Sequence, residues 1–530
     1  MRATRGAASA AQEALLTHRI QLQSPHTRTP PPIETHPDVL NAFLSDAAHV
    51  PAGVATGVAT PHNADEIAAL MRGARRILPI GAQSSLTGGA TPRGDLVIST
   101  RALTDITRLS SQAVRVGAGV PLAALQQALA SDGLYYPPVP TYDGAFVGGT
   151  IATNAAGAAT FKYGSTRRWV DALRVVLADG SLAEITRGEV TASPDGLFEL
   201  QTAQDDAIRV PIPSYAMPDV AKLSAGYFAS PGMDLIDLFI GSEGTLGIVI
   251  DATLRVIPLP RRCSMLVTCA SDTQALAVTS ALRQEAVTSW RGDGTLDVSA
   301  VEFMDSRALA FAPDEVLARA GVERPVGETV LLLVQLDIAD REDEALARMS
   351  AVLESCDVTV DPQVAPAGDD RGSARLFELR EAVPAGVNAE VAGAKERVHP
   401  DIEKVAGDFV VPFERQQEAL ALYRDTFERY RLEYALWGHV SDGNMHPNLV
   451  PRSLADVTSG KAALLEIARR VVAMGGAPLA EHGVGRSALK QQLLREMYGD
   501  DGIEEMRAVK RALDPEWKLA AGVLFTEPAP

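Results

Sequence analysis

Cysteine is scarce in this sequence of 530 residues, where it occurs only as Cys263, Cys269 and Cys356. An odd number with these spacings forms neither a disulfide framework nor a zinc site of the CxxC kind. We therefore expect reduced thiols in a protein core and a reducing compartment.

Long apolar runs and an excess of basic charge are also lacking. No run approaches the length of about 18 apolar residues that a membrane-spanning helix needs, although 46% of the residues are hydrophobic. The formal net charge of -18 excludes nucleic-acid binding, which requires a basic face. An acidic substrate would need local arginines or a metal ion to overcome this negative field. We predict a cytoplasmic location, or a mitochondrial one in a eukaryote, and peripheral attachment to a membrane is compatible with both.

The first 35 residues are rich in alanine and arginine, contain little acid, and break at Pro30–Pro32. They lack the apolar core of a secretory signal, so a transit-like segment and a mobile arm are the two interpretations.

Short apolar runs alternate with helical patterns from residue 52 onward. Pro121 has the position of a proline at the first residue of a helix, and Pro258–Pro260 suits a linker. We predict strands at 54–58, 77–80, 96–99, 114–116, 170–178 and 246–257, and helices from 63 and over 121–131.

Beyond the linker, the predicted order is strand, helix, strand, strand, helix, strand, which is typical of a ferredoxin-like sandwich. The apolar strands are 264–269, 330–336 and 432–440, and the helices are near 272–288 and 341–355. The last 70 residues are largely helical by pattern.

The segment Gly438–Asn448 carries the strongest chemical pattern. Asp442-Gly443 is a hairpin-turn signal between two apolar arms. Residues two apart on a strand share a face, so His446 and Asn448 should point into one space that His439 reaches from the other arm. This arrangement predicts half of a metal site.

A catalytic metal site usually has three protein ligands and one open position, so a carboxylate is needed from elsewhere. Glu481, in Ala480–Gly485, is the best candidate. A single histidine is more often a surface or core residue. Here, however, three of only nine histidines, His439, His446 and His482, lie close together in glycine-rich turns.

Three loops of small residues, Gly81–Gly89, Gly148–Gly157 and Gly241–Ile248, offer close approach to the backbone. Each alone is ordinarily a plain connection, and none has the Walker lysine or the Rossmann spacing. Three in one region indicate a large, extended cofactor.

These loops, together with Lys162–Arg167, resemble the flavin-binding segments of the vanillyl-alcohol-oxidase family with a PCMH-type FAD domain. The C-terminal half resembles the branch that contains the D subunit of glycolate oxidase, D-lactate dehydrogenase and D-2-hydroxyglutarate dehydrogenase, which shares the paired-histidine turn and Glu-His-Gly-Val-Gly. The resemblance covers residues 40–525. One departure is Gly81–Ser85, where the family usually has Gly-Gly-Gly-Thr-Ser.

The resemblance implies an α+β protein in four parts. These are an N-terminal extension (1–40), a two-subdomain PCMH-type FAD-binding domain (41–258), a ferredoxin-like antiparallel-sheet substrate or cap domain (259–455), and a C-terminal helical segment that completes the active site (456–530).

The resemblance also implies the site residues. His439, His446 and Glu481 would bind zinc or manganese, and Arg380 would clamp a substrate carboxylate, which suits its fork of donors. Asn448 and Lys395 are further substrate-binding candidates. The FAD contacts would come from Gly81, Ala82, Gln83, Ser84, Ser85, Gly88, Gly148, Gly149, Thr150, Ala152, Asn154, Gly157, Gly244, Gly247, Ile248 and Asn444. The FAD would be non-covalent, because residues 81–165 contain no histidine.

His482 is the predicted base, because it is next to Glu481 and an imidazole titrates near the working pH. A supporting hydrogen bond to a metal ligand is its other interpretation. We predict FAD- and metal-dependent oxidation of a D-2-hydroxy acid, most like D-lactate, with a cytochrome, quinone or electron-transfer flavoprotein as acceptor; a homodimer is compatible with this. The alternatives are a non-redox flavoenzyme similar to alkylglycerone-phosphate synthase and a flavin-free metal-binding protein.

Overall fold

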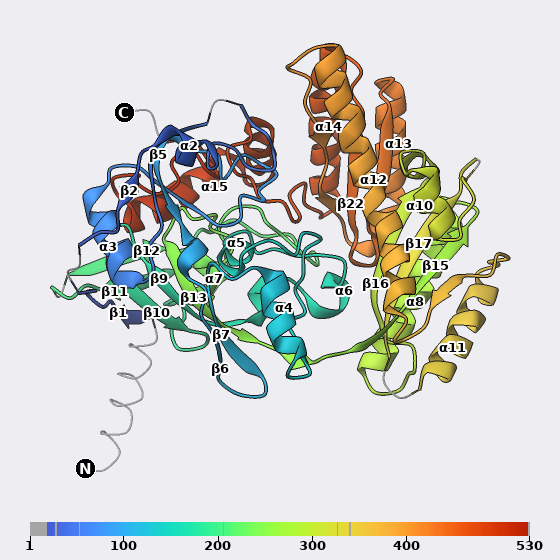
Figure 1. Ribbon diagram of the computed structural model, residues 1–530, viewed down its shortest axis with the longest axis horizontal. Helices are drawn as coiled ribbons and strands as arrows, with labels where there is room; N and C mark the ends of the chain where they lie inside the picture. The colour runs from blue at the N-terminus through green and yellow to red at the C-terminus, as the bar shows by residue number, and fades with distance from the viewer. Residues whose placement is uncertain are drawn as a thin grey trace.

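The computed structural model describes residues 18–26, 29–51, 53–204, 206–325, 327–338 and 341–527. Figure 1 shows two bodies side by side, with the N-terminal half on the left and a second body, built on the strands β15, β16 and β17, on the right. The described part of the predicted N-terminal extension is built into sheets. β1 (Arg19–Gln21) pairs with β11 (Leu197–Gln201), and β2 (Ile33–Glu34) pairs with β3 (Val54–Ala59). The mobile-arm interpretation therefore does not hold for these strands, and residues 1–17 lie outside the described part.

The N-terminal half contains a four-stranded sheet in the order β2-β3-β5-β4 and a five-stranded sheet in the order β10-β9-β13-β7-β6. The strands β4 (Ile77–Ile80) and β3 both run parallel to β5 (Arg93–Ser99). The second sheet is antiparallel and comprises β6 (Ile106–Arg108), β7 (Ala113–Gly117), β9 (Val170–Val176), β10 (Leu182–Thr186) and β13 (Ile248–Arg255). Two smaller sheets are the pair of β8 (Leu134–Tyr135) with β14 (Ile257–Pro258) and the three-stranded sheet β1-β11-β12, where β12 is Ala207–Pro211.

The predicted elements of this half are confirmed to within a few residues. The helix α3 (Ala64–Gly73) begins after Asn63, whose side chain accepts a hydrogen bond from the amide of Glu66. Pro121 is the N-cap of α4 (Leu122–Ala130) and not its first residue, because its ψ of 142° is still extended. Short helices α2 (Pro37–Asn41), α5 (Val147–Ala152), α6 (Thr160–Tyr163) and α7 (Leu235–Phe239) complete the half.

The second half is built on one sheet in the order β18-β15-β17-β16-β21-β22-β19, with β20 also pairing with β22. Its strands are β15 (Arg261–Cys269), β16 (Val298–Asp305), β17 (Val330–Ile338), β18 (Gln363–Ala365), β19 (Val405–Ala406), β20 (Phe409–Val410), β21 (Tyr434–His439) and β22 (Asn444–Leu449). The order β15-α8-β16-β17-α11-β18 is ferredoxin-like. The fourth strand of this unit is β18, however. The predicted strand 432–440 comes later in the sequence as β21, which pairs with β16. The sequence pattern missed β16 because all eight of its residues are buried, so polar and apolar side chains do not alternate along it.

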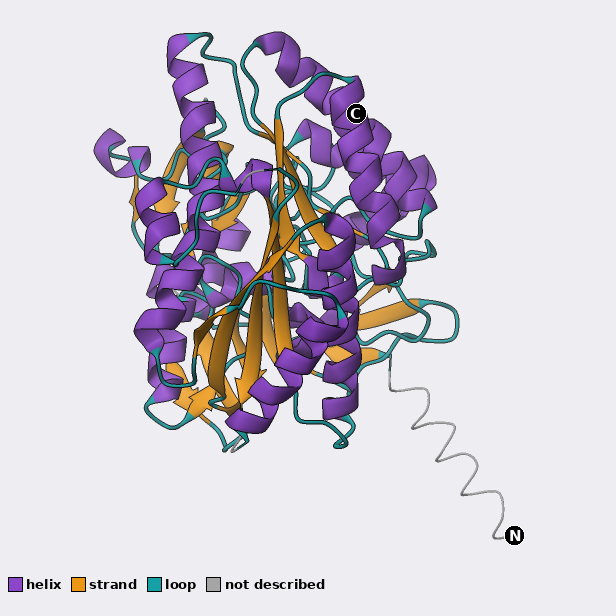
Figure 2. Ribbon diagram, turned by 90° about the vertical axis from the view of Figure 1, so that its right-hand side faces the viewer, coloured by secondary structure: helices purple, strands orange, loops and turns teal. Residues whose placement is uncertain are grey.

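Helices cover both faces of this sheet (Figure 2). They are α8 (Asp272–Trp290), α9 (Ser306–Leu309), α10 (Asp314–Arg319), α11 (Glu342–Ser355), α12 (Asp370–Arg397), α13 (Gln416–Arg429) and α14 (Leu454–Ala473). The last helix, α15 (Ala488–Leu513), instead packs on β12 of the N-terminal half and on α14. The helix α12 packs Leu379 and Val383 into the apolar cluster that holds Met304 and Trp437, so it lies on the face of β16 and β21 to which these side chains point. None of the described helices combines the length and the apolar composition needed to cross a bilayer.

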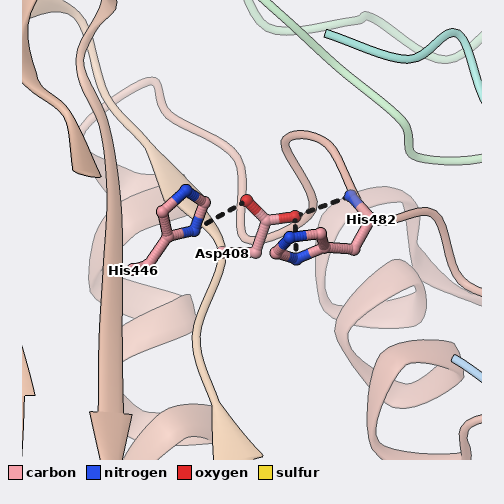
Figure 3. A group of neighbouring side chains, drawn as sticks. All are labelled: Asp408, His446 and His482. Carbon is pink, nitrogen blue, oxygen red and sulfur yellow. Dashed lines mark hydrogen bonds and ion pairs between the residues drawn. The ribbon is translucent and has the colours of Figure 1, made fainter. Parts of the chain in front are cut away.

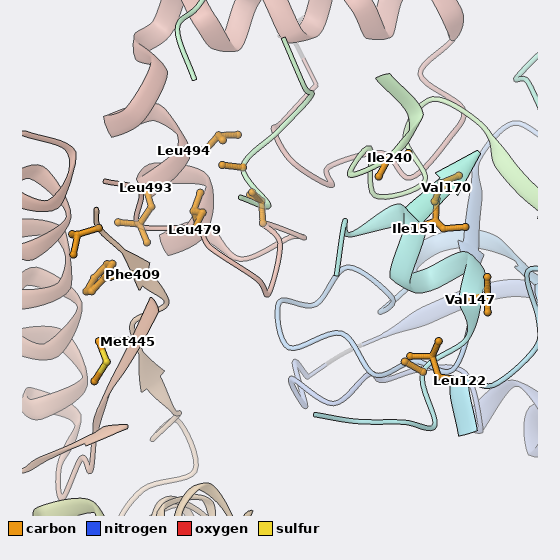
Figure 4. Close-up of a cluster of buried hydrophobic side chains, with 14 of the residues drawn as sticks. Leu122, Val147, Ile151, Val170, Ile240, Phe409, Met445, Leu479, Leu493 and Leu494 are labelled. Carbon is orange, nitrogen blue, oxygen red and sulfur yellow. The ribbon is translucent and has the colours of Figure 1, made fainter. Parts of the chain in front are cut away.

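The C-terminal segment is helical as predicted, and it then returns to the N-terminal half. Leu519 forms a bridge to Ile77 of β4, and Lys510 of α15 donates hydrogen bonds to the carbonyls of Thr245 and Leu519 at 2.7 and 2.8 Å. Figure 4 shows side chains of the shared core, from Phe409 and Met445 through Leu479, Leu493 and Leu494 to Ile151 and Val170. The C-terminal segment therefore ties the two halves together.

Replacing Lys510 by Met should destabilise the protein strongly. Lys510 and its partner Asp514 have side chains that are only 2% and 1% exposed, so the change leaves a buried carboxylate uncompensated. We expect a loss of about 3–5 kcal/mol in the free energy of unfolding, measured by urea denaturation. Lys461→Met, which removes an exposed ion pair with Glu403, is the control and should cost about 1 kcal/mol or less. Equal losses would contradict the role given to Lys510.

Candidate functional site

The hairpin of β21 and β22 brings the predicted polar residues to one face. His439 is paired with Asn444, Trp437 with His446, and Ala435 with Asn448. Cross-strand partners lie on the same side of a sheet, so both histidines share a face with Asn448, as predicted. The chain reverses at Gly443, which has φ of +85°, and a Cβ there would lie 2.1 Å from the carbonyl oxygen of Val411. Only glycine fits this turn.

His439, His446 and Glu481 converge, with their ligand atoms within 4.8 Å of one another. One Glu481 oxygen, Oε1, is 3.3 Å from His439 Nε2, and Oε2 is 3.5 Å from His446 Nε2. Burial lowers the pKa of His446 to about 3, which keeps its imidazole neutral and able to ligate. Two imidazole nitrogens and a carboxylate form a donor set that suits zinc, and the group therefore fits the predicted ion.

A buried carboxylate faces the other nitrogen, Nδ1, of each imidazole. Glu302 pairs with His439, and Asp408 lies 3.6 Å from His446 Nδ1 and 3.1 Å from His482 Nδ1 (Figure 3). Such carboxylates orient metal-binding histidines so that Nε2 faces the ion. Asp408, His446 and His482 also lie close enough together to form a second cluster of ligating groups. The Oδ2 atom of Asp408, however, already accepts from the amides of Glu481 and His482, both at 2.9 Å.

Arg380 is connected to the same group through Glu302. Its Nε donates to Glu302 Oε2 at 2.7 Å, and both side chains are buried. Although burial opposes ionisation, His439 and Arg380 hold the pKa of Glu302 at about 2. Burial also opposes the charged imidazole, but Glu302 raises the pKa of His439 to about 9. None of the described residues accepts a hydrogen bond from the terminal nitrogens of Arg380, so they are available to a carboxylate.

Lys222 is a site residue that the sequence did not reveal. Its side chain is fully buried, and Nζ lies 2.6 Å from Glu481 Oε1 and 2.8 Å from Asp442 Oδ2. Burial opposes its charge, but these two carboxylates raise the pKa of Lys222. Lys222 follows Val220 and Ala221 in a segment without regular secondary structure, so nothing in the local pattern marked it.

Two hydrogen bonds join the segment 222–224 to the second glycine loop. Ser224 Oγ donates to the carbonyl of Thr153 at 2.7 Å, and Asn154 Nδ2 donates to the carbonyl of Leu223 at 3.0 Å. The predicted flavin loop and the predicted metal ligand Glu481 are therefore connected through one short segment.

The first glycine loop presents free donors. It connects β4 to β5, and none of the described residues accepts a hydrogen bond from the backbone amides of Ala82, Gln83, Ser84 and Ser85. A cluster of unpaired amides suits a pyrophosphate. Gln83 takes the left-handed conformation, with φ of +56°, and its side chain donates to the carbonyl of Ser45 at 2.7 Å. Gln83 thus stands where the family pattern has glycine, and its side-chain hydrogen bond to Ser45 holds the left-handed backbone in place. Gly88 is also left-handed, with φ of +73°.

The other two loops use glycine mainly for packing. A Cβ at four predicted FAD contacts would collide with the chain, at 2.7 Å or less from Ala118, Val139, Pro79 and Val175 for Gly148, Gly157, Gly244 and Gly247, respectively. Gly149 alone of these five has no atom within 4 Å of such a Cβ, so it borders open space. The remaining predicted contacts are Thr150 and Ala152 in α5, the left-handed Asn154, and the first residue of β13, Ile248.

Of the remaining predicted residues, Asn444, Asn448 and His482 lie at the site, whereas Lys395 does not. Asn444 and Asn448 are buried, and their Oδ1 atoms have no hydrogen-bond partner among the described residues. His482 is 31% exposed and lies at the edge of the cluster. Lys395 is not brought to this site, because it is exposed and lies 15 residues beyond Arg380, or roughly 22 Å along α12.

Comparisons with known proteins agree with this architecture. Residues 55–186 match the family described as FAD binding domain, and residues 261–524 match FAD linked oxidases, C-terminal domain. A D-2-hydroxyglutarate dehydrogenase of Xanthomonas citri pv. viticola is 30% identical over 489 residues, which cover 89% of this chain and 90% of that protein. A D-lactate dehydrogenase of Archaeoglobus fulgidus is 29% identical, with coverage of 88% and 90%.

A solved structure of alkyldihydroxyacetonephosphate synthase has the same fold. It superposes with a TM-score of 0.58 at 14% sequence identity, covering 88% of this chain and 76% of the other. The predicted fold, with an FAD-binding PCMH-type domain, is therefore confirmed.

Replacing Glu302 by Gln should weaken the support of the site. The neutral Gln side chain would leave the buried guanidinium of Arg380 without a charged partner. His439 would lose the negative charge that raises its pKa. We expect a loss of about 3 kcal/mol in the free energy of unfolding of the metal-free protein. Glu285→Gln, which breaks an exposed pair with Arg348, is the control, with an expected loss of about 1 kcal/mol or less. An equal loss in both variants would show that Glu302 does not hold Arg380 and His439.

Proposed function

Because the chain belongs to the family of FAD-linked oxidases, we propose that it oxidises a D-2-hydroxy acid of the lactate type to the 2-oxo acid. The observation that carries the proposal is the convergence of His439, His446 and Glu481 beside His482, with Arg380 joined to His439 through Glu302. The names of the relatives, D-2-hydroxyglutarate dehydrogenase and D-lactate dehydrogenase, support the class of substrate.

When bound, FAD supplies a hydride acceptor, and a divalent ion at His439, His446 and Glu481 lowers the pKa of a substrate hydroxyl. The protein supplies the remaining functions. Arg380 binds the substrate carboxylate through its terminal nitrogens, and His482 takes the hydroxyl proton on Nε2. A bound flavin would accept the hydrogen on the same carbon as a hydride, and a cytochrome, a quinone or an electron-transfer flavoprotein would take its electrons.

Buried charges of the chain prepare this arrangement. Although burial opposes ionisation, Lys222 and His439 hold the pKa of Glu481 well below its usual range, so the carboxylate is ready to ligate. Asn448 lies two residues from His446 on the same face and is suited to contact the substrate. Lys395 has no part in this proposal, because the structure leaves it far from the site.

Anaerobic mixing of the purified holoprotein with D- and L-2-hydroxy acids tests the function. We expect D-lactate and similar D-acids to bleach the visible flavin absorbance, with the L-acids much slower. Bleaching by no D-acid would sink the proposal. A flavin that stays oxidised would favour a non-redox flavoenzyme, as in the structurally similar synthase, and a purified protein without flavin would favour the metal-binding alternative.

Replacing His446 by Ala separates the two cofactors. The variant should lose the divalent ion, measured by elemental analysis, and reduce its flavin about 10²-fold more slowly or worse, while FAD content stays unchanged. His399→Ala removes a half-buried histidine that lies just beyond the end of α12, and it should change neither metal nor FAD content. Loss of FAD from His446→Ala would show that the proposed division of labour is wrong.

A further inference from the structure

One carboxylate, that of Asp408, contacts two of the three clustered histidines. We propose that Asp408 is a positioning residue that sets the tautomer of both His446 and His482, so that one Nε2 faces the ion and the other is free to act as base. The part that concerns His482 rests on the proposed function, whereas the part that concerns His446 needs only metal binding.

The surroundings of Asp408 fix its orientation. It is fully buried in the bend between β19 and β20, both of which pair with β22. Its Oδ2 accepts from the amides of Glu481 and His482, both at 2.9 Å, and its Oδ1 accepts from Asn444 Nδ2 at 3.1 Å. Asp408 therefore ties the loop of the predicted ligand Glu481 to the hairpin of the other two ligands.

The remaining contacts of Asp408 are with imidazoles. Oδ2 is 3.1 Å from His482 Nδ1, and Oδ1 is 3.6 Å from His446 Nδ1, slightly longer than a hydrogen bond (Figure 3). No described residue forms a hydrogen bond with His446 Nδ1, so Asp408 is the carboxylate that faces it. A carboxylate accepts but does not donate, so each Nδ1 that faces it favours the protonated form. The lone pair of each neutral ring then lies on Nε2. For His446 this atom is 3.5 Å from Glu481 Oε2, which is the side of the predicted ion.

The surroundings of Asp408 favour its negatively charged form. Its two oxygens accept from two backbone amides and from the side-chain amide of Asn444, and hydrogen bonds of this kind favour the carboxylate form. Lys490 is also buried, and its ammonium has no hydrogen-bond partner among the described residues. A permanent negative charge beside His482 also stabilises the imidazolium that forms when this ring takes a proton.

His439 follows the same rule with a different partner. Its Nδ1 contacts Glu302, and its Nε2 faces Glu481 Oε1 at 3.3 Å. All three histidines thus present Nδ1 to a buried carboxylate. Asp408 is distinctive because one residue serves both a ligand and the base.

Asp408→Asn tests the proposal with little change of shape. The two backbone amides favour the amide oxygen at the position of Oδ2, so the amide nitrogen would face His446 Nδ1 and force the ring into the Nε2–H tautomer. We expect the affinity of the metal-free protein for Zn²⁺, measured by titration calorimetry, to fall by about 10–100-fold. His482 Nδ1 still faces an oxygen in this variant, but the negative charge that stabilises its imidazolium is lost. With Zn²⁺ in excess, flavin reduction should therefore slow by about 10²-fold or more while the Kd of the D-acid changes by less than about threefold.

Asp305→Asn is the matched control. Asp305 is also buried, accepts from the amides of Ala308 and Leu436, and pairs with Arg424, but the structure records no contact between it and a histidine of the described chain. This variant should retain the metal affinity and the reduction rate of the wild type to within about threefold, whatever it costs in stability.

A double-mutant cycle distinguishes positioning from a general effect on structure. In the His482→Gln background, Asp408→Asn should slow flavin reduction by less than about threefold more, because its effect passes through the missing ring. Effects that multiply would overturn the proposal for His482. Wild-type metal affinity in Asp408→Asn would overturn it for His446.

A measurement on the unchanged chain covers the case in which Asp408→Asn does not fold. The ¹⁵N shifts of histidine in the metal-free wild-type protein should report Nδ1–H tautomers for His446 and His482, and Nε2–H tautomers would overturn the proposal. If no D-acid reduces the wild-type flavin, the proposed function fails, but the metal titration and the tautomer still decide the inference for His446.

Discussion

A carboxylate that is buried must be neutralised by a cation or by several hydrogen bonds, and the site depends on this constraint. Glu302, Asp408, Asp442 and Glu481 are packed around the hairpin of β21 and β22, with most of their surface removed from water. Removing one partner from a buried pair costs about 3–5 kcal/mol, so each of these groups restricts the positions of the others. The counter-charges are Arg380 for Glu302 and Lys222 for both Asp442 and Glu481. The imidazoles fill the remaining space with fixed orientations, because each has a carboxylate at Nδ1. The geometry of the site therefore follows from charge balance as much as from apolar packing.

This balance requires both halves of the chain. Lys222 comes from the N-terminal half, whereas Glu481 and Asp442 come from the second half. The loop that carries Glu481 is held from two sides. Asp408 accepts from its first amides, and Glu243 of the N-terminal half accepts from the amides of Val484 and Gly485 at 2.7 and 2.8 Å. Burial raises the pKa of Glu243 to about 7 despite these two bonds. The loop thus lies where the glycine loops of one half meet the hairpin of the other, and a flavin and an ion bound there would be neighbours.

Local regularities explain what the sequence could predict. The period of a strand and the Asp442-Gly443 turn were sufficient to place His439, His446 and Asn448 on one face, because register in a hairpin is fixed by its turn.

The features that the sequence could not predict depend on long-range pairing. Lys222 has an unremarkable local sequence, and its partners are far away along the chain. The strand β16, with Glu302, is buried on both faces and has no period to detect. Lys395 is a candidate by resemblance alone, and the helix α12 continues through Pro384 and carries it away from the site. Most predicted flavin glycines have a second reason to be small, because the chain itself occupies the space of a side chain.

The net charge of the protein and the charge of the site have opposite consequences. A formal charge of -18 repels an organic acid at long range, and salt screens this repulsion within about 8–10 Å at physiological ionic strength. Inside the site, distances are shorter and water is excluded, so individual groups decide. Glu302 bonds only the Nε of Arg380, and no described residue accepts a hydrogen bond from the two terminal nitrogens. A neutral partner in place of Glu302 would leave Arg380 without an anchor. A second carboxylate at the terminal nitrogens would block the incoming acid. The single contact at Nε holds the guanidinium in place and leaves its fork open, and the proposed binding of an acid by an acidic protein requires such an open fork.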